Sequence, residues 1–184
     1  MRHRKACGCA AAIGLAAGGL GSGMAEAGPT PLPAEVVEAM NEALADERKA
    51  HATYEAILDR FGDVRPFVNI VQAEQRHIDM LLPLYARYDV TPPADETVVP
   101  EAVQTEDMLG LCRIGVQAEI DNVRLYDDQL LPAVADYPDI SAVMQRLRDA
   151  SQNNHLPAFQ RCVDRGGQPG RGPGGGFGRR HGQG

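Results

Sequence analysis

The chain has 184 residues, with 18 Lys and Arg against 25 Asp and Glu, which gives a formal net charge of −7 at pH 7. This length favours a single domain with room for a substantial core. The acidic balance argues against a protein that binds the phosphate backbone of nucleic acid, and it suits a protein that attracts cations. An acidic solvated surface without any cation site is the commoner alternative.

Residues 1–27 have the pattern of a secretory signal peptide. Three basic residues before position 6 precede an apolar run over 10–20, and the small-residue sequence Ala-Glu-Ala at 25–27 suits cleavage. The run is shorter than the roughly 20 apolar residues that span a bilayer, so we expect no stable membrane anchor. We therefore predict an exported protein, periplasmic or extracellular, in which residues 28–184 carry 15 Lys and Arg against 24 Asp and Glu.

Residues 165–184 are mostly Gly, Arg, Pro and Gln. This composition buries too little apolar surface to offset the entropy of ordering, so we expect a disordered tail. Residues 28–164 are then the single folded domain.

Four stretches of this domain repeat apolar residues at helical spacing, and few of their residues are β-branched. They cover about 33–61, 66–88, 105–131 and 139–163. Short links make the first and second, and the third and fourth, antiparallel neighbours. Thr105 is the expected N-cap of the third helix, and Pro157 is expected to kink the fourth.

The segment 89–104 contains three prolines and no helical period, so it is expected to be one long connection. Extended, it reaches about 50 Å, whereas a helix of 20 residues is only about 30 Å long. It can therefore cross a whole bundle. The sequence predicts an all-α four-helix bundle with a long crossover between its second and third helices.

Each helical stripe of apolar residues is interrupted near its middle by a carboxylate or an imidazole. These residues are Glu47, Glu74 with His77, Glu119, and His155. Buried charges need partners, and the partner that all four helices can share is a metal ion. The alternative is a metal-free, salt-bridged polar layer, but no Lys or Arg lies on these stripes to neutralise three carboxylates. His51 lies one turn from Glu47 but towards the flank of the first helix, so it is expected near the surface.

The residues around this layer resemble an uncharacterised ferritin-like family of bacterial and archaeal proteins, over about 34–163. The resemblance rests on Glu47 with Tyr54, Phe67-x-x-Ile70-x-x-x-Glu74-x-x-His77, Glu119-x-Asp121, and Ser151-x-x-Asn154-His155-Leu156-x-Ala158-Phe159. It implies the di-metal carboxylate site of ferritins and rubrerythrins, in which two helices supply one Glu each and two supply Glu-x-x-His. It also implies oxidation of ferrous iron by oxygen or peroxide.

The fourth helix departs from that pattern. Gln152 lies three residues before His155, and Ser151 lies four before it, so one carboxylate is missing. The remaining three Glu and two His can hold two metals with water as a further ligand, or one. Tyr54 and Tyr126 each follow a proposed ligand by seven residues; we assign them, with Ser151 and Gln152, to positions beside the ligands, with packing favoured over a redox role for the tyrosines.

Oxygen and imidazole ligands suit iron, manganese or zinc, and we expect two iron ions. Three functions follow as alternatives: a ferroxidase or peroxidase-type oxidoreductase, a non-enzymatic exported metal-binding or stress protein, and a structural helical module. The expected partners are metal ions and not nucleic acid. A homodimer is a possible assembly, whereas a ferritin-like shell is not expected.

Antiparallel third and fourth helices also bring two cysteines to one level. Cys112 lies seven residues before Glu119, and Cys162 lies seven residues after His155. Export permits a disulfide between them. Two free core thiols are the alternative.

Overall fold

The computed structural model describes residues 31–168, and over this range the fold is all-helical, with no strand. The predicted signal peptide and residues 169–184 of the predicted tail lie outside the described residues. None of the described helices is both long and apolar enough to cross a membrane. The elements are α1 (Ala34–Phe61), α2 (Phe67–Arg87), α3 (Ala102–Thr105), α4 (Met108–Leu125), the π-helix η1 (Tyr126–Leu130), α5 (Leu131–Ala133), α6 (Pro138–Ala150), the π-helix η2 (Ser151–His155) and α7 (Leu156–Asp164).

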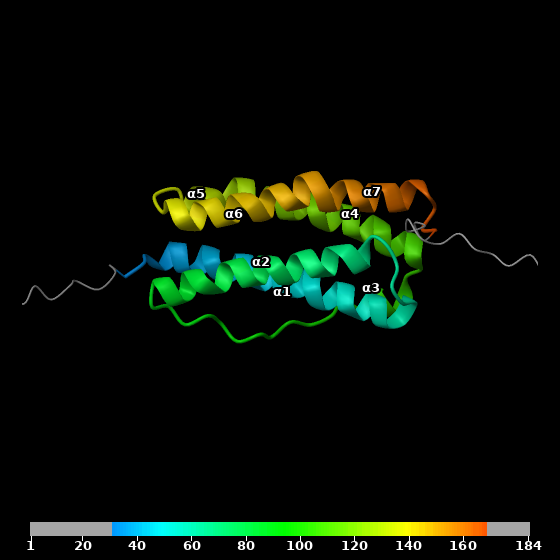
Figure 1. The fold of residues 1–184 in the computed structure, drawn as a ribbon, viewed down its shortest axis with the longest axis horizontal. Helices are drawn as coiled ribbons and strands as arrows, with labels where there is room; N and C mark the ends of the chain where they lie inside the picture. The colour runs from blue at the N-terminus through cyan, green and yellow to red at the C-terminus, as the bar shows by residue number, and fades with distance from the viewer. Residues whose placement is uncertain (1–30, 169–184) are drawn as a thin grey trace, which may run out of the picture.

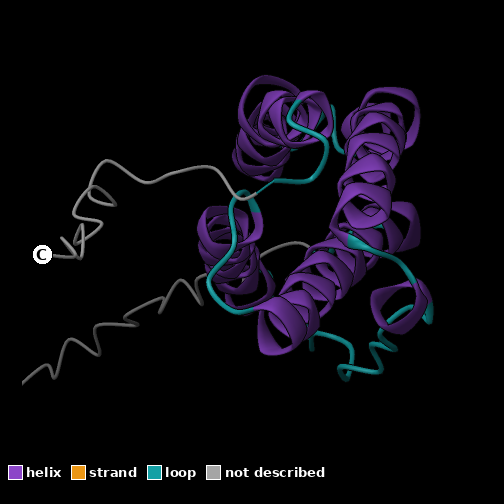
Figure 2. Cartoon of the chain, turned by 90° about the vertical axis from the view of Figure 1, so that its right-hand side faces the viewer, coloured by secondary structure: helices purple, strands orange, loops and turns teal. Residues whose placement is uncertain are grey.

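The helices form two layers (Figures 1 and 2). One layer is the antiparallel pair α1 and α2. The other pairs α4, η1 and α5 with α6, η2 and α7. This arrangement is compatible with the predicted four-helix bundle.

The sequence explains both ends of α1. Pro33 precedes α1, where its missing N–H costs nothing. Gly62 ends α1 with a φ of 76°, a conformation that favours glycine. Val36 and Ile57 lie on the buried face of α1, whereas the next residues along the chain, Val37 and Leu58, are half-buried.

Two π-helices interrupt the second layer, and each is followed by a proline. η1 ends at Leu130, two residues before Pro132, and η2 ends at His155, two residues before Pro157. Proline lacks an N–H, and its ring clashes with the carbonyl four residues earlier in an α-helix. A π turn shifts the hydrogen bonds to i→i+5 and accommodates the proline. The irregularity expected at Pro157 therefore takes the form of a π turn placed before it.

The long connection runs beside the α1–α2 layer, on its outer side (Figure 1). Arg48 of α1 donates to the carbonyl oxygen of Pro93 over 2.9 Å and lies 3.8 Å from the carboxylate of Asp95. The predicted absence of helix over 89–104 is wrong at its end, where α3 forms and buries Val103.

The predicted N-cap at Thr105 is wrong. Thr105 ends α3, and Asp107 caps α4 by accepting a hydrogen bond from the backbone N–H of Gly110 over 2.8 Å. Asp caps at least as well as Thr. Arg60 of α1 donates to the backbone carbonyl of Glu106 over 2.9 Å and so holds the residue beside the cap.

Two hydrophobic clusters fill the space between the layers, one towards each end. The first gathers Met40, Leu44, Leu81 and Tyr85 with residues of η1 and α6. The second contains Phe67, Phe159 and the disulfide between Cys112 and Cys162, whose Cα atoms are 6.0 Å apart. The polar residues of the predicted metal layer lie between the two clusters.

The second cluster predicts a large effect for one small substitution. An alanine Cβ at Gly115 would come within 2.6 Å of the Phe159 ring, which packs against Phe67 at a centroid distance of 5.3 Å and cannot move freely. Overpacking of this kind costs roughly 1–3 kcal/mol, so Gly115→Ala is expected to lower the free energy of unfolding by that amount in denaturant titration. In the control Gly110→Ala, the new methyl meets only the exposed side chain of Glu106. Equal destabilisation by both variants would contradict this account.

Candidate metal centre

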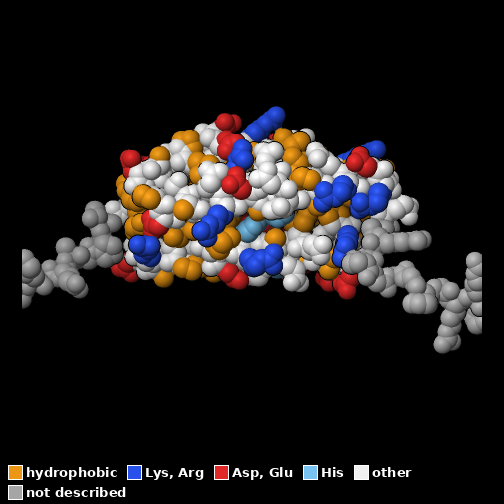
Figure 3. Space-filling model, turned by 45° about the horizontal axis from the view of Figure 1, so that its top comes forward, with side chains coloured by type: hydrophobic (Ala, Val, Ile, Leu, Met, Phe, Trp, Pro, Cys, Tyr) orange, Lys and Arg blue, Asp and Glu red, His pale blue; other side chains and the backbone are white. Residues whose placement is uncertain are grey.

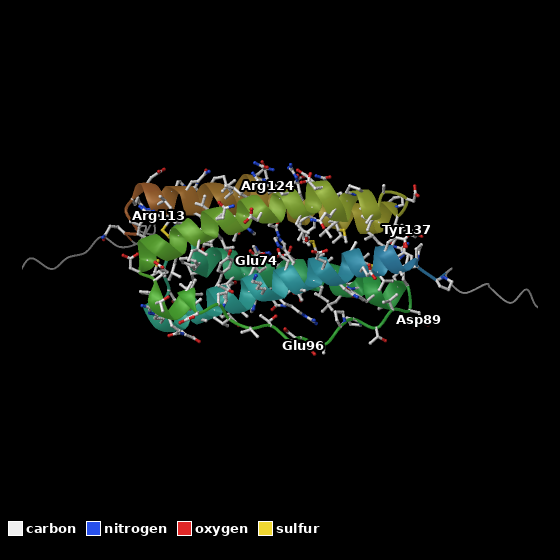
Figure 4. All side chains as sticks on the ribbon, turned by 180° about the vertical axis from the view of Figure 1, so that it is seen from behind. Glu74, Asp89, Glu96, Arg113, Arg124 and Tyr137 are labelled. Atoms are coloured by element: carbon white, nitrogen blue, oxygen red, sulfur yellow. A yellow bond between two sulfur atoms is a disulfide. The ribbon has the colours of Figure 1, made fainter. Side chains whose placement is uncertain are left out.

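Five ionisable side chains meet midway between the layers. Glu47 comes from α1, Glu74 and His77 from α2, Glu119 from α4, and His155 from η2. All five are at most 5% exposed. Figure 4 shows Glu74 between the layers, whereas Arg113 and Arg124 lie on the outside. The structure therefore brings together all five residues that the sequence predicted as ligands.

Glu74 is the centre of this group. Its two carboxylate oxygens lie 2.9 Å from Nδ1 of His77 and 3.2 Å from Nδ1 of His155. The two imidazole rings are nearly parallel, with centroids 5.5 Å apart. One carboxylate thus faces both histidines.

The other two glutamates lie on opposite sides of the histidine pair. Glu47 Oε2 lies 2.9 Å from Nδ1 of His77, and Glu119 Oε2 lies 3.6 Å from Nδ1 of His155. Each histidine is therefore flanked by Glu74 and by one further carboxylate.

Two tyrosines hold the outer carboxylates in a crossed arrangement. Tyr54 of α1 donates to Glu119 of α4 over 3.2 Å, and Tyr126 of η1 donates to Glu47 of α1 over 3.0 Å. Burial and the nearby carboxylates raise the pKa of both tyrosine hydroxyls well above the ordinary value, so they remain donors. Each outer glutamate has one oxygen fixed by a tyrosine and the other turned towards a histidine.

Protons partly neutralise this layer when no metal is bound. Burial raises the pKa of Glu47 to about 8. Burial acts in the same direction on Glu74, but its close contacts with His155 and His77 outweigh it and lower its pKa to about 2. Burial lowers the pKa of each imidazole, yet their carboxylate partners prevail and raise it to about 9 for His77 and about 10 for His155. Histidines thus supply the cations that Lys and Arg do not.

The donor set fits a metal ion better than it fits hydrogen bonding alone. Nδ1 of His77 can carry one proton but lies 2.9 Å from oxygens of two carboxylates. Nδ1 of His155 is buried and makes no hydrogen bond of acceptable geometry. Ligand atoms of Glu74, His77 and His155 all lie within 4.8 Å of one another. This buried cluster could hold a metal ion.

The position of the missing carboxylate is filled by Ser151. Ser151 is 4% exposed, whereas Gln152 is half-buried. The π turn of η2 explains why Ser151, and not Gln152, accompanies His155. A π turn is wider than an α turn, so it aligns His155 with the residue four positions earlier. In the α-helix α2, by contrast, Glu74 and His77 are aligned at a spacing of three residues. The sequence indicated the absence of a glutamate but not the π turn.

Two residues considered near the layer do not join it. His51 pairs with Glu55 of the next helical turn over 3.4 Å, as expected for a flank position. Asp121 is exposed and accepts a hydrogen bond from Gln117. Neither residue contributes to the buried cluster.

Sequence reasoning missed a second polar pair beside the layer. Asp46 of α1 accepts a hydrogen bond from the side-chain amide of Asn122 of α4. Burial raises the pKa of Asp46, although the bond from Asn122 opposes this shift. Asp46 is off the apolar stripe of its helix, so periodicity could not identify it.

A cleft between α1 and α4 leads to this layer, with a cavity volume of about 560 Å³. Glu47, Glu74, Glu119 and Ser151 all line it. Figure 3 draws a different face of the molecule, with scattered groups of both charges and with histidine visible near its middle. The candidate centre is thus buried but can be approached from α1 and α4.

The sequence model of a family described as "Uncharacterized protein domain (DUF2202)" matches residues 39–171. The chain belongs to this family. The crystal structure of a hypothetical protein from Methanococcus jannaschii is similar, with a TM-score of 0.65 and 21% identity over 76% of this chain and 86% of that one. At this identity the likeness concerns the fold. No curated protein matches the chain.

Proposed function

We propose that this member of the DUF2202 family is an exported metal-binding protein with a ferritin-like four-helix bundle. Glu47, Glu74, His77, Glu119 and His155 hold two iron ions, and the protein oxidises ferrous iron with oxygen or peroxide. The observation that carries the proposal is the convergence of three carboxylates on two buried histidines at distances of 2.9–3.6 Å. Export is supported by the Cys112–Cys162 disulfide, because such bonds persist in oxidising compartments.

The residues of the chain have distinct roles in this proposal. Glu74 lies between both histidines and would be the central ligand, while Glu47 and Glu119 would each serve one side. Tyr54 and Tyr126 orient the outer carboxylates, and such supporting hydrogen bonds tune metal affinity. Bound ferrous iron supplies one electron per ion for reduction of oxygen or peroxide. The two hydrophobic clusters flank the layer, one towards each end of the bundle.

The test is oxidation of ferrous iron by the anaerobically loaded protein. On mixing with oxygen or peroxide, the parent is expected to form ferric iron at least about tenfold faster than iron in buffer, and Glu47→Ala is expected to lose this acceleration, because one proposed metal ligand is gone. The exposed Glu38→Ala on the same helix is the matched control. Metal binding without accelerated oxidation would leave a non-enzymatic metal-binding protein.

A structural polar layer is the second candidate function. It is favoured by the raised pKa values of His77 and His155, which allow imidazolium–carboxylate pairs without metal. Metal content separates this candidate from the first. Homodimer formation stays a prediction, which light scattering of the purified protein can check.

A further inference from the structure

The cleft between α1 and α4 has two chemically different parts. Its floor carries the oxygens of the metal layer, including Glu74 and Ser151. Its walls are largely apolar and include Ala50, Ile57 and Phe67. A cavity of about 560 Å³ falls in the size range of small-molecule sites, which combine apolar walls with a few polar groups.

The floor has one open position. Glu74 accompanies His77 on α2, but the corresponding companion of His155 is Ser151, whose side chain is shorter and carries no charge. Because Ser151 lines the cleft, the space that a fourth carboxylate would occupy is reached from the cleft. A ligand from solution can therefore supply the oxygen atoms that the chain does not.

Charge indicates the sign of that ligand. Two divalent cations exceed the charge of the three carboxylates Glu47, Glu74 and Glu119 by one, and an anion at the open position balances the difference. The rim does not decide the sign, because Lys49 and Asp121 both line it. The net positive charge of the metal-loaded layer, and not the charges at the rim of the cleft, therefore favours an anion.

We propose that this cleft binds a small monocarboxylate with a compact hydrophobic body, and that its carboxylate occupies the position left open by Ser151. The proposal rests on the proposed metal centre. The hydrophobic body lies against the apolar walls, where burial of apolar surface adds affinity that acetate lacks. The carboxylate supplies the specificity, because an alcohol of the same shape has no negative charge to interact with the metal layer.

Binding is tested with phenylacetate as the probe and with redox-inert zinc in the centre. Isothermal titration calorimetry of the zinc-loaded protein is expected to show phenylacetate binding at least about tenfold tighter than acetate or 2-phenylethanol. The zinc-free protein is expected to bind phenylacetate at least about tenfold more weakly than the loaded protein, because without zinc the layer has no excess of positive charge to attract an anion.

Two variants locate the bound probe. Ser151→Glu places a carboxylate of the chain in the open position and is expected to weaken phenylacetate binding at least about tenfold while zinc content is retained; Ser151→Ala keeps the space and the affinity. Ala50→Leu fills part of the wall and is expected to weaken phenylacetate but not acetate. Ala52→Leu, on the same helix but not lining the cleft, is its control.

The outcomes separate this inference from the function on which it rests. Absence of bound zinc and iron in the parent would overturn the metal centre and this inference together. Bound zinc with phenylacetate no tighter than acetate, or with equal affinity in Ser151→Glu and Ser151→Ala, would overturn the inference alone. If Ser151→Glu does not fold, equal phenylacetate affinities of Ala50→Leu and Ala52→Leu would overturn the inference and leave the metal centre unaffected.

Discussion

Protein purified anaerobically with ferrous iron is expected to contain about two iron ions per chain, and Glu74→Ala is expected to lose both. Glu74 is the one carboxylate within 3.2 Å of both histidines, so its removal takes a ligand from each side of the centre. His155→Ala is expected to lose at least one ion, because its imidazole has no substitute on η2. Metals are measured by mass spectrometry after gel filtration.

Matched controls come from the same chain. Glu38→Ala removes an exposed carboxylate from α1, and His51→Ala removes a histidine whose recorded partner is Glu55. Both controls are expected to keep the iron content of the parent. Retention of two irons in Glu74→Ala would exclude the proposed ligand set, and an iron-free parent would leave the structural polar layer as the function of the cluster.

Removal of the disulfide is expected to produce the largest loss of stability. The bond joins Cys112 of α4 to Cys162 of α7 across 50 residues of chain, a span that contains most of the second layer. In the chain-entropy account, closing a loop of this size contributes about 4 kcal/mol. The double variant Cys112→Ala, Cys162→Ala should therefore unfold at markedly lower denaturant concentration than the oxidised parent.

The reductant provides the control for this measurement. Dithiothreitol is expected to destabilise the parent and to leave the double variant unchanged, because only the parent has this bond to lose. A parent equally stable with and without reductant would show that packing around Phe159 and Leu111, and not the cross-link, holds this end of the molecule.

Several features of the fold were readable from local patterns. Apolar residues at helical spacing predicted the all-helical class, and the first predicted helix, 33–61, matches α1 closely. The extended segment after α2 was recognisable because its prolines break helical hydrogen bonding. The short helix α3 was not predicted, because it is stabilised by the packing of Val103 against the second hydrophobic cluster, which local sequence does not reveal.

The candidate ligands were predictable for a related reason. A carboxylate or imidazole on an apolar stripe is conspicuous in sequence, and five such residues do meet in one layer. Their pairing was not predictable, because the crossed bonds of Tyr54 to Glu119 and Tyr126 to Glu47 join helices far apart in the chain. The pairing of Asp46 with Asn122 was missed because each lies beside the stripe of its own helix and meets the other only across the layers.

The sequence by itself determined the four long helical stretches, the apolar stripe of each, and which ionisable groups must find partners inside, because these properties depend on residue spacing along one helix. Only the tertiary structure decided that Glu74 faces both histidines, that a π turn presents Ser151 in place of a fourth carboxylate, and that a cleft between α1 and α4 opens onto that position. These features depend on the distances and rotations between helices, which are set by side-chain packing and cannot be obtained from the periodicity of any one helix.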